Sequence, residues 1–283
     1  MQLDGERESD NVEDRRGISG GVMAGGGGLV ALVIGLVVYF ITGQPPAQLT
    51  DQGGGGTALQ RTGVVPDKAT EDRMTQFVRK VLASTEDVWE EQFKRRGMTY
   101  RRPTLVLFAG QVDSACGRAT ASSGPFYCPG DQKLYIDLAF YRELETRFKA
   151  PGDFAQAYVI AHEVGHHVQR LLGTMDKVDR RGGSKSEANA LSVRLELQAD
   201  FYAGVWAHHA QKTKKILEPG DLEEGFRAAQ AVGDDTIQKR AQGYVVPESF
   251  THGTAKQRMA WFKKGFQTGD MSVGDTFSLP DPN

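Results

Sequence analysis

The residues that could do chemistry in this chain are concentrated in the run His162-Glu163-Val164-Gly165-His166. In a helix, residues four positions apart lie on one face, so His162 and His166 can bind a single Zn²⁺. Glu163 lies one position round, where its carboxylate can reach a catalytic water molecule without becoming a ligand. Chance alone gives this pattern in roughly one chain in a hundred of this histidine content. The run therefore predicts a catalytic metal site of the kind that metalloproteases use.

A catalytic zinc site needs a third protein ligand and one open position. The extended histidine motif HExxHxxGxxH is excluded, because Gln169 and Leu172 stand three and six residues after His166. We therefore expect the third ligand to be a glutamate on a later helix.

The segment ALSVRLELQADFYAGVWAHH supplies that glutamate. Glu196 and Asp200 are four residues apart and share a helix face with small and apolar residues, where unpaired carboxylates are costly to bury. We expect Glu196 to bind zinc and Asp200 to accept a hydrogen bond from the outer nitrogen of a ligating histidine. A solvated acidic face is the alternative interpretation, and His208 and His209 are rival ligands.

Three other residues have two interpretations each. His252, in a turn before the predicted helix of ESFTHGTAKQRMAWF, could donate a hydrogen bond to a tetrahedral oxyanion, or it could be a turn or cap residue. Arg258 could pair with Asp200 or Glu196, or it could be a surface charge. His167 could support a metal ligand, although a place on the helix surface is favoured.

Helices and a small sheet must position these residues. Apolar spacing predicts a helix after residue 67, a helix around the motif with its N-cap at Asp153 and its end at Gly173, and a long helix over 186–211. Buried strands are predicted over 102–110 and 133–140. The predicted fold class is α+β and mainly helical, with a zincin-like domain whose small sheet precedes the active helix.

Later breaks in the helical pattern are predicted at Pro219-Gly220, Gly233 and Gly243.

An uncharged stretch near the start predicts a membrane anchor. Its apolar centre is Leu29–Ile41, and residues 17–43 are long enough to span a bilayer. An uncleaved anchor is favoured over a cleaved signal peptide or a buried helix, because the preceding segment is acidic and no convincing cleavage site follows. Arg15 and Arg16 precede the span and Arg61 is the first cation after it, so the N-terminus is expected in the cytoplasm and the later domain outside.

The two cysteines fit that location. Cys116 and Cys128 lie in the short, turn-rich segment CGRATASSGPFYC, and such a pair in an extracytoplasmic domain indicates a disulfide. Two reduced thiols are the alternative if the orientation is wrong. The net charge of −2 gives no basic excess, so a nucleic-acid partner is not expected.

The predicted organisation has five parts: a polar cytoplasmic stub, expected to be disordered (1–16), a transmembrane signal anchor (17–43), a Pro- and Gly-rich linker (44–66), a zinc metallopeptidase domain (67–268) and a flexible tail (269–283).

With these pieces assembled, the chain resembles the bacterial family of neutral zinc metallopeptidases (YpfJ-like proteins). The segments that look like its signatures occur in order: NVEDRRG, ACGRATASSGPFYCPGDQKLYIDLAF, DFAQAYVIAHEVGHHVQRLLG, ELQADFYAGVW and THGTAKQR. The resemblance implies a gluzincin-type zincin fold, with His162, His166 and Glu196 as zinc ligands and Glu163 as general base. One departure is the phenylalanine and tyrosine after ELQAD, where a cysteine would be common in relatives.

We therefore expect a membrane-anchored, zinc-dependent endopeptidase that acts on a peptide or protein substrate; its oligomeric state is not predicted. Substrate is expected to lie along LYIDLAF or TLVLFAG by strand addition. The alternatives are a non-proteolytic zinc hydrolase, such as an envelope amidase, and a catalytically silent metal-binding interaction protein. The intact Glu163 argues against the silent protein, because zinc binding alone does not need it.

Overall fold

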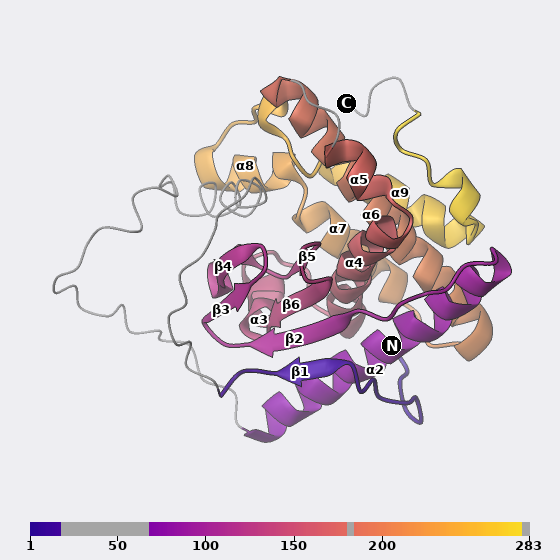
Figure 1. Cartoon of the computed structure of the whole chain (residues 1–283). Coiled ribbons are helices and arrows are strands. Elements are labelled where there is room, and N and C mark those ends of the chain that lie inside the picture. Colours follow the sequence, from indigo (N-terminus) through magenta and orange to yellow (C-terminus); the bar gives the residue numbers. More distant parts are fainter. Residues whose placement is uncertain (18–67, 180–183, 279–283) are drawn as a thin grey trace, which may run out of the picture.

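A four-stranded sheet with the strand order β1-β2-β6-β5 lies beside the helices of this chain (Figure 1). The computed structural model describes residues 1–17, 68–179 and 184–278. Three strands are parallel and β5 runs antiparallel beside β6. The strands are β1 (Val12–Asp14), β2 (Thr104–Phe108), β5 (Phe126–Cys128) and β6 (Lys133–Asp137).

Alternate residues of β6 face two different cores. Leu134 and Ile136 join the large core beneath the helices, whereas Tyr135 joins a smaller core on the other face. A hairpin of β3 (Gln111–Ser114) and β4 (Gly117–Thr120) covers that smaller core. Both faces of β6 are therefore covered by protein, which confirms the predicted burial of this strand.

Helices make up most of the described chain, so the predicted α+β, mainly helical class is confirmed. They are α2 (Lys68–Arg95), α3 (Ala139–Thr146), α4 (Asp153–Leu171), α5 (Thr174–Asp179), α6 (Lys185–Lys214), α7 (Asp221–Ala231), α8 (Asp234–Gln242) and α9 (Ala255–Thr268), with short 3₁₀ turns η2 (Ala121–Ser123), η3 (Pro247–Ser249) and η4 (Met271–Val273).

The helix boundaries follow the predicted breaks. Gly220 precedes α7, and Gly233 and Gly243 flank α8. Other boundaries differ from the prediction. The strand over 133–140 ends early because its last residues already belong to α3, and α4 has Gly152 rather than Asp153 as its N-cap.

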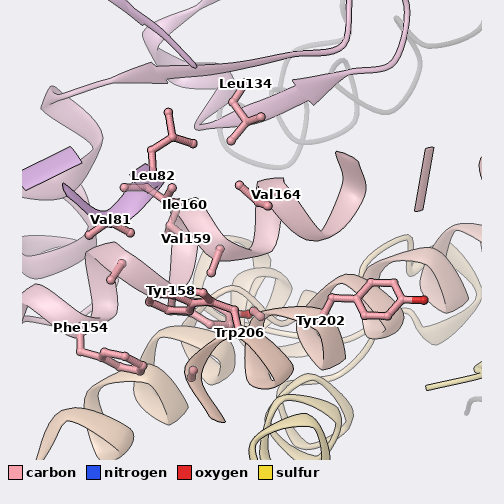
Figure 2. Packing of buried hydrophobic residues seen from close by; sticks show 14 of the residues in the cluster. Val81, Leu82, Leu134, Phe154, Tyr158, Val159, Ile160, Val164, Tyr202 and Trp206 are labelled. Atoms are coloured by element: carbon pink, nitrogen blue, oxygen red, sulfur yellow. The ribbon is translucent and has the colours of Figure 1, made fainter. Parts of the chain in front are cut away.

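Helix α4 lies between the sheet and the other helices. Ile160 and Val164 point toward Leu134 of the sheet, and Tyr158 lies near Trp206 of α6 (Figure 2). All five side chains are almost completely buried, which stabilises the fold by roughly 1.5–3 kcal/mol for each large apolar side chain. This packing holds α4 at a fixed distance from α6.

Glycines let these helices approach closely. A Cβ atom at Gly165 of α4 would lie 2.8 Å from the carbonyl oxygen of Ala199 in α6. A Cβ atom at Gly204 of α6 would lie 2.1 Å from the carbonyl oxygen of Phe262 in α9. The lack of a side chain at these two positions therefore lets α4 approach α6 and lets α6 approach α9.

Both predicted chain ends differ from expectation. Residues 1–16 are not a disordered stub, because β1 pairs with β2 and Leu3 and Ser9 are buried. The predicted flexible tail packs on α6 as far as Thr276, which is completely buried and accepts a hydrogen bond from Arg194 at 2.6 Å. The residue composition of the two ends correctly indicated that they are polar, but it could not reveal these long-range contacts.

No helix in the described part of the chain is long and apolar enough to cross a membrane. The predicted anchor over 17–43 and the linker over 44–66 lie outside the described residues, except for Gly17.

Candidate metal centre

Two histidines of α4 and one glutamate of α6 converge on a single point. His162 Nε2 lies 3.1 Å from Glu196 Oε2, and His166 Nε2 lies 3.4 Å from Glu196 Oε1. One ligand atom from each residue lies within 4.8 Å of the others. Two imidazole nitrogens and a carboxylate oxygen are a donor set of catalytic zinc sites, so the residues present fit a zinc ion.

The electrostatics of this cluster favour a cation. Burial opposes protonation of His162, yet the carboxylates of Asp200 and Glu196 raise its pKa to about 10. Burial likewise opposes ionisation of Glu196, yet His166 and His162 hold its pKa well below the usual value. The cluster therefore attracts positive charge, which a proton or a metal ion can supply.

A buried network supports His162 from behind. Asp200 Oδ1 lies 2.9 Å from His162 Nδ1 and also accepts a hydrogen bond from the Tyr158 hydroxyl. Arg258 donates from Nε to Asp200 Oδ2 at 2.8 Å and from Nη2 to Oδ1 at 3.0 Å. Although burial opposes ionisation, Arg258 holds the pKa of Asp200 below its usual value. The structure thus places Asp200 and Arg258 in the predicted contacts, with Arg258 buried rather than on the surface.

A neutral relay supports His166. Its Nδ1 lies 2.9 Å from the side-chain oxygen of Gln169, and Gln169 Nε2 donates to the carbonyl oxygen of Leu195 at 2.7 Å and to Gln198 Oε1 at 3.1 Å. Gln198 Nε2 in turn donates to the carbonyl oxygen of Gly274 at 2.9 Å. These amides connect a candidate ligand to α6 and to the C-terminal segment.

His252 faces the same site from the turn before α9. Its Nδ1 lies 3.1 Å from Asp234 Oδ1, and Asp234 Oδ2 accepts the backbone N–H groups of Thr251, His252 and Gly253. Burial opposes protonation, but Asp234 raises the pKa of His252 above its ordinary value. Thr254 is the N-cap of α9, so His252 is not the helix cap.

Glu163 lines a cavity of about 240 Å³. The three candidate metal ligands lie at one end of this cavity, and apolar side chains form one of its walls. The polar end carries the three candidate ligands together with Glu163, His252 and Arg258. The wall contains the large apolar side chains Phe140, Phe148, Val159, Val232 and Ile237.

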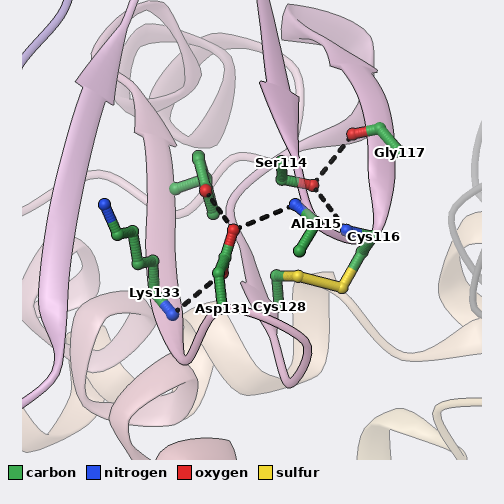
Figure 3. Close-up of a disulfide and its surroundings, with 8 residues drawn as sticks. Ser114, Ala115, Cys116, Gly117, Cys128, Asp131 and Lys133 are labelled. Atoms are coloured by element: carbon green, nitrogen blue, oxygen red, sulfur yellow. Dashed lines mark hydrogen bonds between the residues drawn. A yellow bond between two sulfur atoms is a disulfide. The ribbon is translucent and has the colours of Figure 1, made fainter. Parts of the chain in front are cut away.

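The predicted disulfide between Cys116 and Cys128 is confirmed, and it braces another part of this cavity (Figure 3). Asp131 strengthens the same loop by accepting the backbone N–H groups of Ala115 and Lys133. The chain between the two cysteines contributes Ser122–Tyr127 to the cavity lining, so the disulfide restrains one wall of the candidate site.

Three other histidines lie elsewhere. His167 is buried and bonds the Tyr127 hydroxyl and the carbonyl oxygen of Arg101, so the favoured surface position is wrong. His208 and His209 bond the carbonyl oxygens of Phe266 and Gly269. These rival ligands therefore contact the C-terminal end of α9 and do not line the cavity.

Sequence reasoning missed Tyr158, Gln169 and Asp234. Tyr158 and Gln169 had a usable signal, because they stand four residues before His162 and three residues after His166, on the same helix faces. Asp234 had none, since only the tertiary fold brings it to His252.

Comparison with known proteins agrees with this geometry. Residues 1–277 match the family model described as "Putative neutral zinc metallopeptidase". The uncharacterized protein YpfJ of Escherichia coli (strain K12) is 48% identical over 296 residues, covering 98% of this chain and 99% of YpfJ. The uncharacterized protein Rv2575 of Mycobacterium tuberculosis (strain ATCC 25618 / H37Rv) is 47% identical over 192 residues, covering 64% of each chain. No solved structure matches. The chain therefore belongs to the neutral zinc metallopeptidase family, whose name implies a zinc-dependent hydrolase.

Proposed function

We propose that the protein is a zinc-dependent endopeptidase. The observation that carries this proposal is the cavity in which the cluster of His162, His166 and Glu196 meets Glu163 and an apolar wall. A site that only stored metal would need neither a free carboxylate beside the ligands nor room for an organic substrate.

The roles of the side chains follow from their positions. His162, His166 and Glu196 would hold a zinc ion, which would supply polarisation of a carbonyl group and a lowered pKa of water. Glu163 takes a proton from the attacking water and then gives it to the leaving amine, so it ends the cycle ionised. His252, held by Asp234, donates a hydrogen bond to the oxygen of the attacked carbonyl group.

We also propose where a peptide substrate lies relative to the sheet. β2 and β6 each have neighbours on both sides, so the predicted substrate position along either strand is wrong. β5 is an outer strand of the sheet, and Phe126 and Tyr127 of β5 line the cavity. An extended peptide added beside β5 would pass the metal-ligand cluster.

The apolar wall favours one kind of substrate. Apolar side chains such as Phe140, Phe148 and Ile237 predominate in this lining over the carboxylate of Glu143. The charge of Arg258 is offset by Asp200. We propose that cleavage occurs next to a large apolar residue, aromatic or branched aliphatic.

Proteomic identification of new peptide ends tests this function. Cells with the wild-type protein are compared with cells that carry Glu163→Gln in the same background. We expect ends present only with the wild type, enriched in large apolar residues beside the cut. Identical sets of ends in the two strains would contradict the proposal.

Metal analysis tests the ligand set. Glu196→Ala should lower zinc affinity strongly, whereas Glu145→Ala, which removes an exposed carboxylate of α3, should leave it unchanged. Undiminished zinc content in Glu196→Ala would show that another group completes the site.

A further inference from the structure

The first residues of the chain complete a buried charge site. Glu86 of α2 is completely buried. It accepts hydrogen bonds from Ser9 Oγ at 2.6 Å, Asn11 Nδ2 at 2.7 Å and Arg7 Nη2 at 2.8 Å. Arg102 approaches to 3.6 Å as a further cation. Since a buried carboxylate without partners is strongly destabilising, the fold around α2 depends on residues 7–11.

The same segment completes the sheet. β1 pairs with β2 in parallel register, Val12 opposite Leu105 and Asp14 opposite Leu107. The Lys133 ammonium of β6 also reaches Glu13 at 2.7 Å. β1 is therefore an outer strand of the same sheet whose other outer strand lines the cavity (Figure 1).

The described residues that precede position 18 and those that follow position 67 lie side by side. Arg16, just before that stretch, lies 3.7 Å from Glu71, just after it. Gln76 bonds Glu8 at 2.9 Å, and Arg79 bonds the carbonyl oxygen of Ser9 at 3.0 Å. A single helix across a bilayer would instead separate its two flanks by about 30 Å of hydrocarbon.

We infer that residues 1–16 are an integral part of the catalytic body and share its compartment. This arrangement and a single-pass anchor with a cytoplasmic N-terminus exclude each other.

Cysteine labelling of the full-length protein in intact cells tests the inference. Asp10→Cys places a thiol at an exposed position of the N-terminal segment, and Glu145→Cys places one at an exposed position of α3. The native cysteines form a disulfide, and the wild-type protein labelled in parallel corrects for any reaction at them. A membrane-impermeant maleimide should label both variants or neither, and both should react after lysis. Labelling of only one variant in intact cells would overturn the inference.

Cross-linking provides a second, independent test. The paired variant Glu13→Cys/Lys133→Cys replaces an ion pair between β1 and β6, and a short bis-maleimide, which alkylates one thiol at each end, should join the two positions in cells. The matched control Glu13→Cys/Glu145→Cys should not cross-link. No cross-link between positions 13 and 133, with both thiols reactive after denaturation, would show that the segment does not occupy the sheet.

Discussion

The two candidate histidine ligands differ in the charge of their supporting groups. His162 is backed by the carboxylate of Asp200, whose charge Arg258 offsets, whereas His166 is backed by the neutral amide of Gln169. Such groups fix ring orientation and raise the basicity of the ligand. Loss of either supporting group is therefore expected to lower zinc affinity, whereas loss of Glu163 should lower turnover at unchanged zinc occupancy.

Gln169→Leu should lower zinc affinity about 10- to 100-fold, because His166 loses the acceptor that orients its ring. Competition with a chelator of known affinity measures this change. Gln92→Leu makes the same substitution at a buried glutamine of α2 and should leave affinity unchanged. Equal zinc affinities for the two variants would contradict the role of Gln169.

His252→Phe should reduce kcat by about 10²- to 10³-fold with unchanged zinc content, because a donor to the carbonyl oxygen is lost. Asp234→Asn should reduce kcat less, since the imidazole remains but loses its ionic partner. A His252→Phe enzyme with wild-type kcat would remove His252 from the mechanism.

At the scale of elements, one face of α4 carries the candidate metal ligands, and its other faces pack against the rest of the protein. His167 contributes to this packing, since its hydrogen bonds connect α4 to Tyr127 of β5 and to Arg101, just before β2. Burial lowers the pKa of His167 to about 4. The unfolded chain therefore binds more protons than the folded chain between about pH 4 and pH 6.5.

The folded state should consequently lose stability as the pH falls through that window, by at most about 3 kcal/mol. Denaturant unfolding of wild type and His167→Gln at pH 7 and pH 5 measures this contribution. The variant should be less stable at pH 7, and the difference should shrink at pH 5. Parallel losses in the two proteins would show that His167 does not titrate in this way.

At the scale of the whole molecule, the N-terminal segment, the sheet and the helices form one body that holds the site. The sequence was sufficient for the local features: the motif helix, the long helix with Glu196 and Asp200, the glycine breaks and the disulfide all follow from spacing and residue type. Contacts between distant segments were not predictable, because the polarity of residues 1–16 is the same for a free segment and for one that pairs with β2 and Glu86. The support of His252 by Asp234 was missed for the same reason.

Asn11→Ala tests whether the N-terminal segment stabilises the folded protein. It removes a hydrogen bond to the buried carboxylate of Glu86 and should lower the free energy of unfolding by about 1.5–3 kcal/mol. Asp10→Ala, at the exposed neighbouring position, should change it by less than about 0.5 kcal/mol. Equal stabilities of the two variants would contradict the structural role of the segment.

The most direct test of the proposed chemistry is the rate of peptide hydrolysis by Glu163→Gln at equal zinc occupancy. The amide keeps the shape of the side chain and leaves His162, His166 and Glu196 in place, but it cannot accept the proton from water. We expect full zinc occupancy with kcat lower by about 10²- to 10⁴-fold. Turnover within a few-fold of wild type at that occupancy would contradict it.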